Sequence, residues 1–168
     1  MLDLKTDSQN YTEYKYYVED LMQSDVVNSM QQFIHHKDIT CLEHSIDVSY
    51  KSFLLCKRLG LDHKSAARGA LLHDLFLYDW HTPKAEISRK GLHGFTHPYT
   101  ALRNATKHFS LNALEKDIIV KHMWPLTIKL PKYKESFIVM LVDKYCAFSE
   151  TINFRRKTSI DQFIEKMK

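Results

Sequence analysis

The sequence predicts an all-α protein, and two observations support this fold class. Only four glycines and four prolines occur in 168 residues, and few stretches alternate between apolar and polar residues as half-buried strands do. Hydrophobic residues (44%) and charged residues (26%) occur in ordinary globular proportions. We therefore expect one domain over residues 1–168, long enough to bury a substantial core.

Two helices are expected to cover this core over residues 10–36. The first runs from about residue 10 to 24 and places four apolar or aromatic side chains at helical spacing, namely Tyr14, Tyr17, Val18 and Leu21. A second helix over residues 25–35 would place His35 and His36 at its C-terminal end, where the helix dipole favours positive charge. We interpret both histidines mainly as solvated end residues.

The next helix is expected to open at Thr40 and to stop at Gly60, because glycine commonly ends helices. His44 lies one turn from its start, on an apolar stripe formed by Val48, Leu55 and Leu59. A histidine in that position can reach inward. A hydrogen-bonded core histidine is the alternative interpretation.

A further helix should begin at Asp62 or His63 and continue through the apolar run at residues 70–79, which contains His73 and Asp74. A buried carboxylate is costly unless it is paired or bound to a metal. Neighbours on a helix point about 100° apart, so the two side chains can flank one ion. A core histidine beside a capping aspartate is the alternative.

Residues 80–94 form a basic connection that contains Lys84, Arg89 and Lys90. Long connections in compact domains often bind ligands, and a cationic one would suit phosphate. A solvated basic loop is the alternative. Arg68 and His81 lie near the His73–Asp74 segment and are further candidates for cationic contacts.

The C-terminal half adds three metal-capable residues. His97 lies beside the helix start expected at Thr96-His97-Pro98, with His93 as the competing candidate. The capping-box spacing of Asn112 and Glu115 opens the next helix, which ends near His122 after Leu114 and Ile118 on one face. Asp143 interrupts the apolar run at 137–148 and needs a partner. A terminal helix is expected over 159–168.

Six inward-facing residues can therefore ligate metal, and together they are harder to explain by packing than singly: His44, His73, Asp74, His97, His122 and Asp143. Nitrogen and oxygen ligands without thiolate suit divalent Fe or Mn first, with Co, Zn, Ni or Mg as alternatives. Six protein ligands exceed what one catalytic ion normally takes. The set fits two ions that share Asp74 as a bridge.

The ordered set of histidine, His-Asp, two histidines and aspartate resembles the HD-domain superfamily of metal-dependent phosphohydrolases over residues 42–148. The resemblance implies a helical bundle with metals at its centre. It assigns His44, His73, Asp74 and Asp143 to one ion, and Asp74 also bridges to a second ion at His97 and His122. The two extra histidines are similar to those of dinuclear members, YqeK-like more than HD-GYP, since no Gly-Tyr-Pro signature occurs.

Two departures affect the expected substrate contacts. Leu77 stands where many members carry lysine, and Cys41 stands where arginine is often found. The resemblance implies hydrolysis of a small phosphorylated compound such as a nucleotide, with His73, Asp74, Lys84 and Arg89 as the catalytic candidates. A di-iron oxygenase and a non-catalytic nucleotide-binding sensor are the alternatives.

Charge and cysteine content limit the partners and the compartment. The formal charge of +4 suits a small anion but falls short of a nucleic-acid-binding surface. No signal core and no membrane-spanning run are found. The odd, widely spaced cysteines are expected to be reduced core residues, namely Cys41, Cys56 and Cys146. We expect a soluble cytoplasmic protein without membrane or nucleic-acid partners, with homo-oligomerisation left open.

Overall fold

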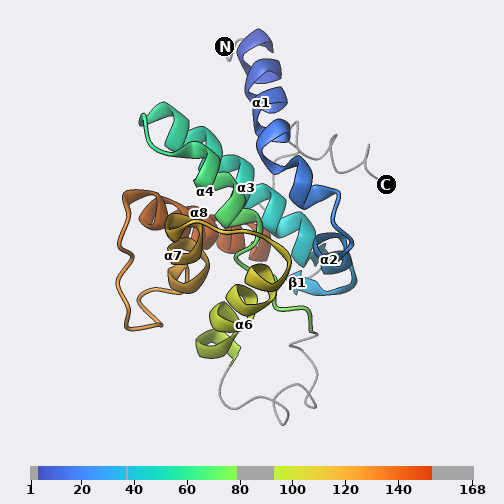
Figure 1. Ribbon diagram of the computed structural model, residues 1–168, viewed down its shortest axis with the longest axis vertical. Coiled ribbons are helices and arrows are strands. Elements are labelled where there is room, and N and C mark those ends of the chain that lie inside the picture. Colours follow the sequence, from blue (N-terminus) through green and yellow to red (C-terminus); the bar gives the residue numbers. More distant parts are fainter. Residues whose placement is uncertain (1–3, 37, 79–92, 153–168) are drawn as a thin grey trace.

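The structure, a computed structural model, describes residues 4–36, 38–78 and 93–152 (Figure 1). These residues form α1 (Leu4–Met22), α2 (Asp25–Asn28), η1 (Ser29–Gln32), α3 (Cys41–Arg58), α4 (His63–Leu71), α6 (His93–His108), α7 (Ala113–Lys121) and α8 (Lys134–Thr151). A small hairpin pairs β1 (Ile34–His36) with β2 (Ile39–Thr40) in antiparallel register. The all-α prediction is confirmed. The helix predicted over 159–168 lies outside the described residues.

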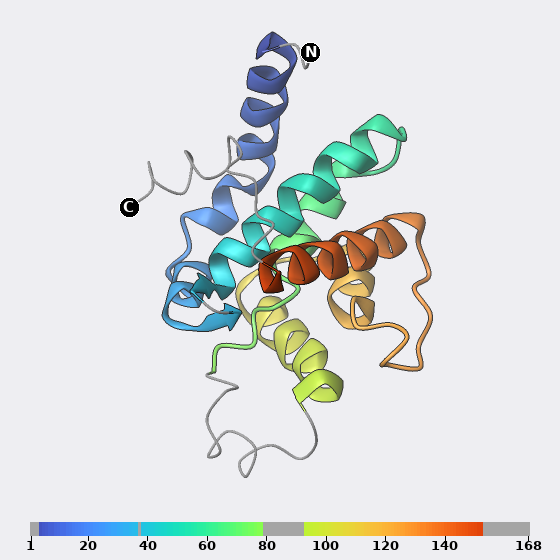
Figure 2. The same ribbon diagram turned by 180° about the vertical axis from the view of Figure 1, so that it is seen from behind.

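Helices α3 and α4 form an antiparallel pair at the centre of the molecule (Figure 1). α8 lies across one side of this pair, the side that faces the viewer in Figure 2. α7 contacts α4 and α8, α6 contacts α7, and α1 packs against α3 and α4. β1 of the hairpin contacts both α3 and α8, and α4 and α7 also contact α8.

Local sequence signals account for the helix starts. Thr40 and Glu43 form a capping box, in which the Glu43 backbone N–H donates to Thr40 Oγ1 at 3.2 Å and the Thr40 N–H donates to Glu43 Oε2 at 3.0 Å. Asn112 and Glu115 make the same arrangement at the start of α7. After α3, Gly60 adopts a φ of +67°, a conformation that glycine allows without a Cβ clash.

The apolar face predicted for the first helix is buried in α1. Tyr14, Val18 and Leu21 join the main apolar core with residues of α3 and α4. The Tyr14 hydroxyl donates to Ser49 Oγ at 3.0 Å, and the Ser49 hydroxyl donates to the Ala67 carbonyl at 2.7 Å. This chain satisfies the buried hydroxyls and ties α1 to both central helices.

Helix α4 ends at Leu71, so the prediction of a helix through residue 79 is wrong. His73 and Asp74 lie in the turns that follow it. Two local bonds replace the helical pattern: His73 Nδ1 bonds the Ala70 carbonyl at 2.6 Å, and the Phe76 N–H bonds the Asp74 carbonyl at 2.7 Å. Leu77 then takes a left-handed φ of 57°, which ends any helical continuation.

Three other predicted boundaries or faces are also wrong. Residues 25–35 are not one helix, because α2 and η1 are short and His35 and His36 belong to β1. α6 begins at His93, three residues before Thr96, so Pro98 lies inside the helix. Leu55 of α3 and Leu59, the residue that caps its C-terminus, are 39% and 56% exposed, so the buried face around His44 does not extend along the predicted stripe.

Close packing between α4 and α7 depends on Gly69. A Cβ added there would lie 2.9 Å from Ile118 Cδ1 and 3.1 Å from Ile118 Cβ. We expect Gly69→Ala to lower the free energy of unfolding by about 1 to 2 kcal/mol, since the overpacking cost exceeds the gain in helix propensity. Urea denaturation of metal-free protein measures this change. Gly69→Ala combined with Ile118→Ala should cost less than the sum of the single changes, and full additivity would contradict the packing account.

Candidate metal centre

The structure brings all six metal-capable residues into one buried cluster. Each side chain belongs to a residue that is 8% exposed or less. His44 comes from α3 and Asp143 from α8, while His97 lies in the second turn of α6. The others lie at helix ends, His122 at the C-cap of α7 and His73 and Asp74 just after α4.

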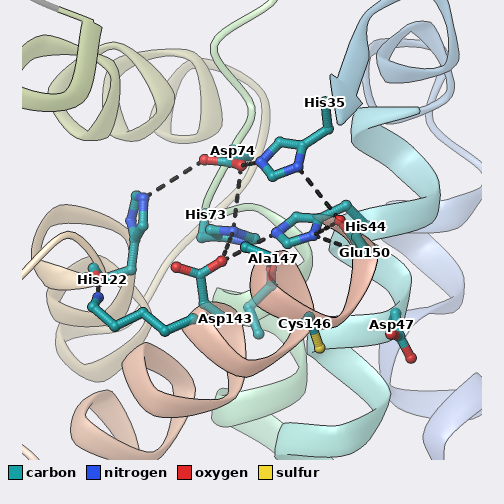
Figure 3. A network of polar contacts seen from close by, with 12 residues as sticks. His35, His44, Asp47, His73, Asp74, His122, Asp143, Cys146, Ala147 and Glu150 are labelled. Carbon is teal, nitrogen blue, oxygen red and sulfur yellow. Dashed lines mark hydrogen bonds and ion pairs between the residues drawn. The ribbon is translucent and has the colours of Figure 1, made fainter. Parts of the chain in front are cut away.

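The carboxylate of Asp74 lies at the middle of the cluster and divides it in two. Its Oδ1 lies 3.3 Å from His97 Nε2 and 3.6 Å from His122 Nε2. Its Oδ2 lies 3.4 Å from His73 Nε2 (Figure 3). Each oxygen of one carboxylate thus faces a different group of imidazoles, which is the arrangement that a carboxylate bridging two cations requires.

The second carboxylate, Asp143, lies on the His44 and His73 side of the cluster. Its Oδ1 is 3.1 Å from His44 Nε2 and 3.5 Å from His73 Nε2. Lys144, the next residue, does not neutralise it and instead donates to the His122 carbonyl at 3.0 Å. The buried carboxylate therefore takes its compensation from imidazoles, in keeping with the cost of leaving it unpaired.

Backbone carbonyls fix the orientation of two of the histidine rings. His73 Nδ1 donates to the Ala70 carbonyl at 2.6 Å, and His122 Nδ1 donates to the Ile119 carbonyl at 2.9 Å. A carbonyl oxygen can only accept, so in the neutral ring the proton resides on Nδ1 and the lone pair on Nε2. Both Nε2 atoms face the Asp74 carboxylate, as metal-binding histidines do when their other nitrogen is anchored.

The donor atoms fit divalent ions by spacing as well as by type. The His73 Nε2 and Asp74 Oδ1 atoms are buried and have no hydrogen-bond partner, although each lies within ion-pair distance of its neighbours. For a metal–ligand distance of about 2.1 Å, adjacent ligand atoms lie about 3.0 Å apart in octahedral and about 3.4 Å apart in tetrahedral geometry. The contacts here run from 2.8 Å (His97 Nε2 to His122 Nε2) to 3.6 Å. The residues present therefore fit bound cations.

The electrostatic environment holds Asp74, Asp143 and His122 in the states that bind metal. Burial alone would raise the pKa of Asp74, but neighbouring His73, His35 and His97 outweigh it and hold that pKa well below its usual value. Burial likewise opposes ionisation of Asp143, and His44 and His73 lower its pKa. Burial together with His73 and His97 lowers the pKa of His122 to about 3, so this imidazole stays neutral. Deprotonated ligands are the form that metal ions require. At His44 and His73 burial lowers the pKa, but the neighbouring carboxylates outweigh it and raise the pKa, to about 10 for His44, so a bound metal would displace these protons.

Two further residues at the centre were not among the predicted ligands. His35, interpreted as a solvated helix end, lies in β1 with a side chain only 12% exposed and its Nε2 3.3 Å from Asp74 Oδ2. Glu150 is 3% exposed and contacts His44 Nδ1 at 3.0 Å. His35, His44 and Asp74 offer ligand atoms that lie within 4.8 Å of one another. Glu150 follows Asp143 by seven residues, so the two lie on the same face of one helix, and this spacing could have predicted that Glu150 lies near the centre.

The predicted cationic contacts receive no support from the described residues. Lys84, Arg89, Lys90 and His81 all lie outside them, and so does the side chain of His93. Arg68 lies among the described residues, and the prediction that it contacts the substrate is wrong. Its guanidinium instead donates to Asp20 of α1 and Glu115 of α7. As predicted, the three cysteines are free and buried.

The fold and the site together define the class of protein: a helical bundle with a buried cluster of histidines and aspartates suited to divalent cations. A family model described as HD domain matches residues 41–147. The chain belongs to the HD domain family. Comparison with curated proteins and with solved structures gave no match.

Among the described helices, none combines the length and the apolarity that crossing a bilayer requires.

Proposed function

We propose that the protein is a phosphohydrolase that binds two divalent ions, with Fe or Mn as the first candidates, and acts on a small phosphorylated metabolite. The single observation that carries this proposal is the position of the Asp74 carboxylate between two groups of imidazoles. Its Oδ1 faces His97 and His122, and its Oδ2 faces His73. Membership of the HD domain family supports it. In two-ion hydrolases the ions lie about 3.5 to 4 Å apart, a separation that one carboxylate can bridge.

The chain supplies a preformed and buried set of donors for this chemistry. Asp74 and Asp143 remain ionised and provide the negative charge that holds cations. The Nε2 atoms of His73 and His122 are aimed at the centre by the carbonyls that bind their Nδ1 protons. When bound, divalent ions of this kind polarise phosphoryl oxygens and lower the pKa of water from about 16 towards about 7.

The proposed substrate is a small compound, and nucleotides are the first class to test. The formal charge of +4 favours anions without providing a polybasic surface. Offsetting the charge that develops on the phosphoryl group is the role we propose for Lys84 and Arg89.

The test is a screen of phosphomonoesters, nucleotides and dinucleotides against metal-free protein reloaded anaerobically with Mn²⁺, Co²⁺ or Fe²⁺. We expect phosphate or nucleotide release that stops with a chelator and returns on adding metal. Asp143→Asn, which keeps the side-chain shape but removes the charge, should release no product above background.

Two outcomes would contradict the proposal. Oxygen uptake by the Fe form with a polyol or phosphonate, without phosphoester hydrolysis, would identify an oxygenase. Nucleotide binding without turnover by fully loaded protein would identify a sensor.

A further inference from the structure

The β1–β2 hairpin places His35 at the metal centre, although His35 is not one of the six predicted ligands. β1 contacts α3 and α8, and the Cys41 N–H donates to the Phe33 carbonyl at 2.8 Å. This bond fixes the hairpin to the first residue of α3, the helix that carries His44. The position of His35 is therefore set by the same element that positions a predicted ligand.

The His35 and His44 rings lie parallel, with centroids 3.8 Å apart and an interplanar angle of 14° (Figure 3). Their Nδ1 atoms point to one carboxylate, that of Glu150, at 3.0 Å from His44 and 3.7 Å from His35. Their Nε2 atoms face the other carboxylates: His44 Nε2 lies 3.1 Å from Asp143 and His35 Nε2 lies 3.3 Å from Asp74. His35 is thus oriented like His44, with Nδ1 toward Glu150 and Nε2 toward an aspartate.

Glu150 has the properties of a carboxylate that orients metal-binding histidines. It is buried in the last turn of α8, where its side chain lies against the Nδ1 atoms of His44 and His35. An ionised carboxylate only accepts, so the 3.0 Å contact favours a neutral His44 ring with its proton on Nδ1 and the lone pair on Nε2. His35 Nδ1 lies 3.7 Å from the same carboxylate, within ion-pair but beyond hydrogen-bond distance. Such a partner commonly raises metal affinity by about 10- to 100-fold.

We propose that His35 is a seventh metal ligand, on the Oδ2 side of Asp74, and that Glu150 is a positioning residue for His35 and His44 as a pair. This inference rests on the two-ion centre proposed above. Counting the described side chains alone, it makes the two sides unequal, because His35 adds a ligand on the Oδ2 side. By the same count, the ion beside His97 and His122 would have fewer protein ligands and more positions for substrate and water.

The experiment measures Mn²⁺ and Co²⁺ affinity by titration against a chelator, together with the visible spectrum of the Co²⁺ form. The variants are His35→Phe, which keeps a ring against His44 but has no nitrogen, His35→Ala and Glu150→Gln. His108→Ala is the matched control, since His108 is an exposed histidine at the end of α6. We expect both His35 variants and Glu150→Gln to weaken the affinity for one ion at least about tenfold.

The Co²⁺ absorption bands should change in both His35 variants and stay unchanged in His108→Ala. Wild-type affinity and an unchanged Co²⁺ spectrum in His35→Phe would overturn the inference while leaving the two-ion centre intact. Failure of wild-type protein to bind any ion would instead overturn the proposed function. Loss of affinity in His35→Ala alone, with His35→Phe unaffected, would assign His35 a packing role and also overturn it.

Discussion

Replacing Asp74 by asparagine is expected to remove both metal ions and to reduce phosphohydrolase activity by on the order of 1000-fold. The physical reason is the position of this carboxylate between two groups of imidazoles, with one oxygen 3.3 Å from His97 Nε2 and the other 3.4 Å from His73 Nε2. Asparagine keeps the shape but loses the negative charge and offers only one oxygen. Elemental analysis of the dialysed variant and the phosphate-release assay measure the two effects.

Asp117→Asn is the matched control for this prediction. Asp117 is an acid on α7 that bonds the Ser136 hydroxyl at 2.8 Å and pairs with Lys121, and it takes no part in the proposed centre. It should retain metal and activity. If Asp74→Asn kept both ions and folded normally by circular dichroism, Asp74 would not be the bridge.

Replacing His122 by alanine should remove one ion and leave the other. His122 Nε2 approaches Asp74 Oδ1, whereas Asp143, His44 and His73 lie together on the other side of the centre. We expect the metal content to fall from two ions to one per chain and activity to fall by about 100- to 1000-fold.

His97→Ala provides an internal check, because His97 Nε2 lies 2.8 Å from His122 Nε2. It should lose the same ion and show the same residual spectrum in the Co²⁺ form. Loss of both ions in either variant, in folded protein, would mean that the two positions are not independent. Retention of both ions would remove these histidines from the ligand set.

Much of the fold was predictable because the relevant signals are local. The capping boxes at Thr40 and Asn112 fix two helix starts, and Gly60 fixes one helix end. Five of the six predicted ligands could be selected from sequence because they interrupt or adjoin apolar stretches, and His97 because it stands beside a helix-start signal. How these residues meet depends on the tertiary packing of five helices, α3, α4, α6, α7 and α8, which the hydrophobic periodicity of the sequence does not contain.

The errors have physical causes of the same kind. The end of α4 at Leu71 depends on the His73 ring bonding the Ala70 carbonyl, a side-chain interaction that helix patterns do not contain. A strand of three residues, such as the one that carries His35, shows too little alternation to be distinguished from a helix end. Glu150 was predictable in principle, but the apolar run recognised in the sequence stops at Phe148, while α8 continues to Thr151.

The most direct test of the two-ion centre is anomalous diffraction from crystals of Mn²⁺-loaded protein. We predict two manganese peaks about 3.5 to 4 Å apart, one on each side of the Asp74 carboxylate. One peak should lie beside His44, His73 and Asp143, and the other beside His97 and His122. A single peak, or peaks that do not contact Asp74, would contradict the central claim.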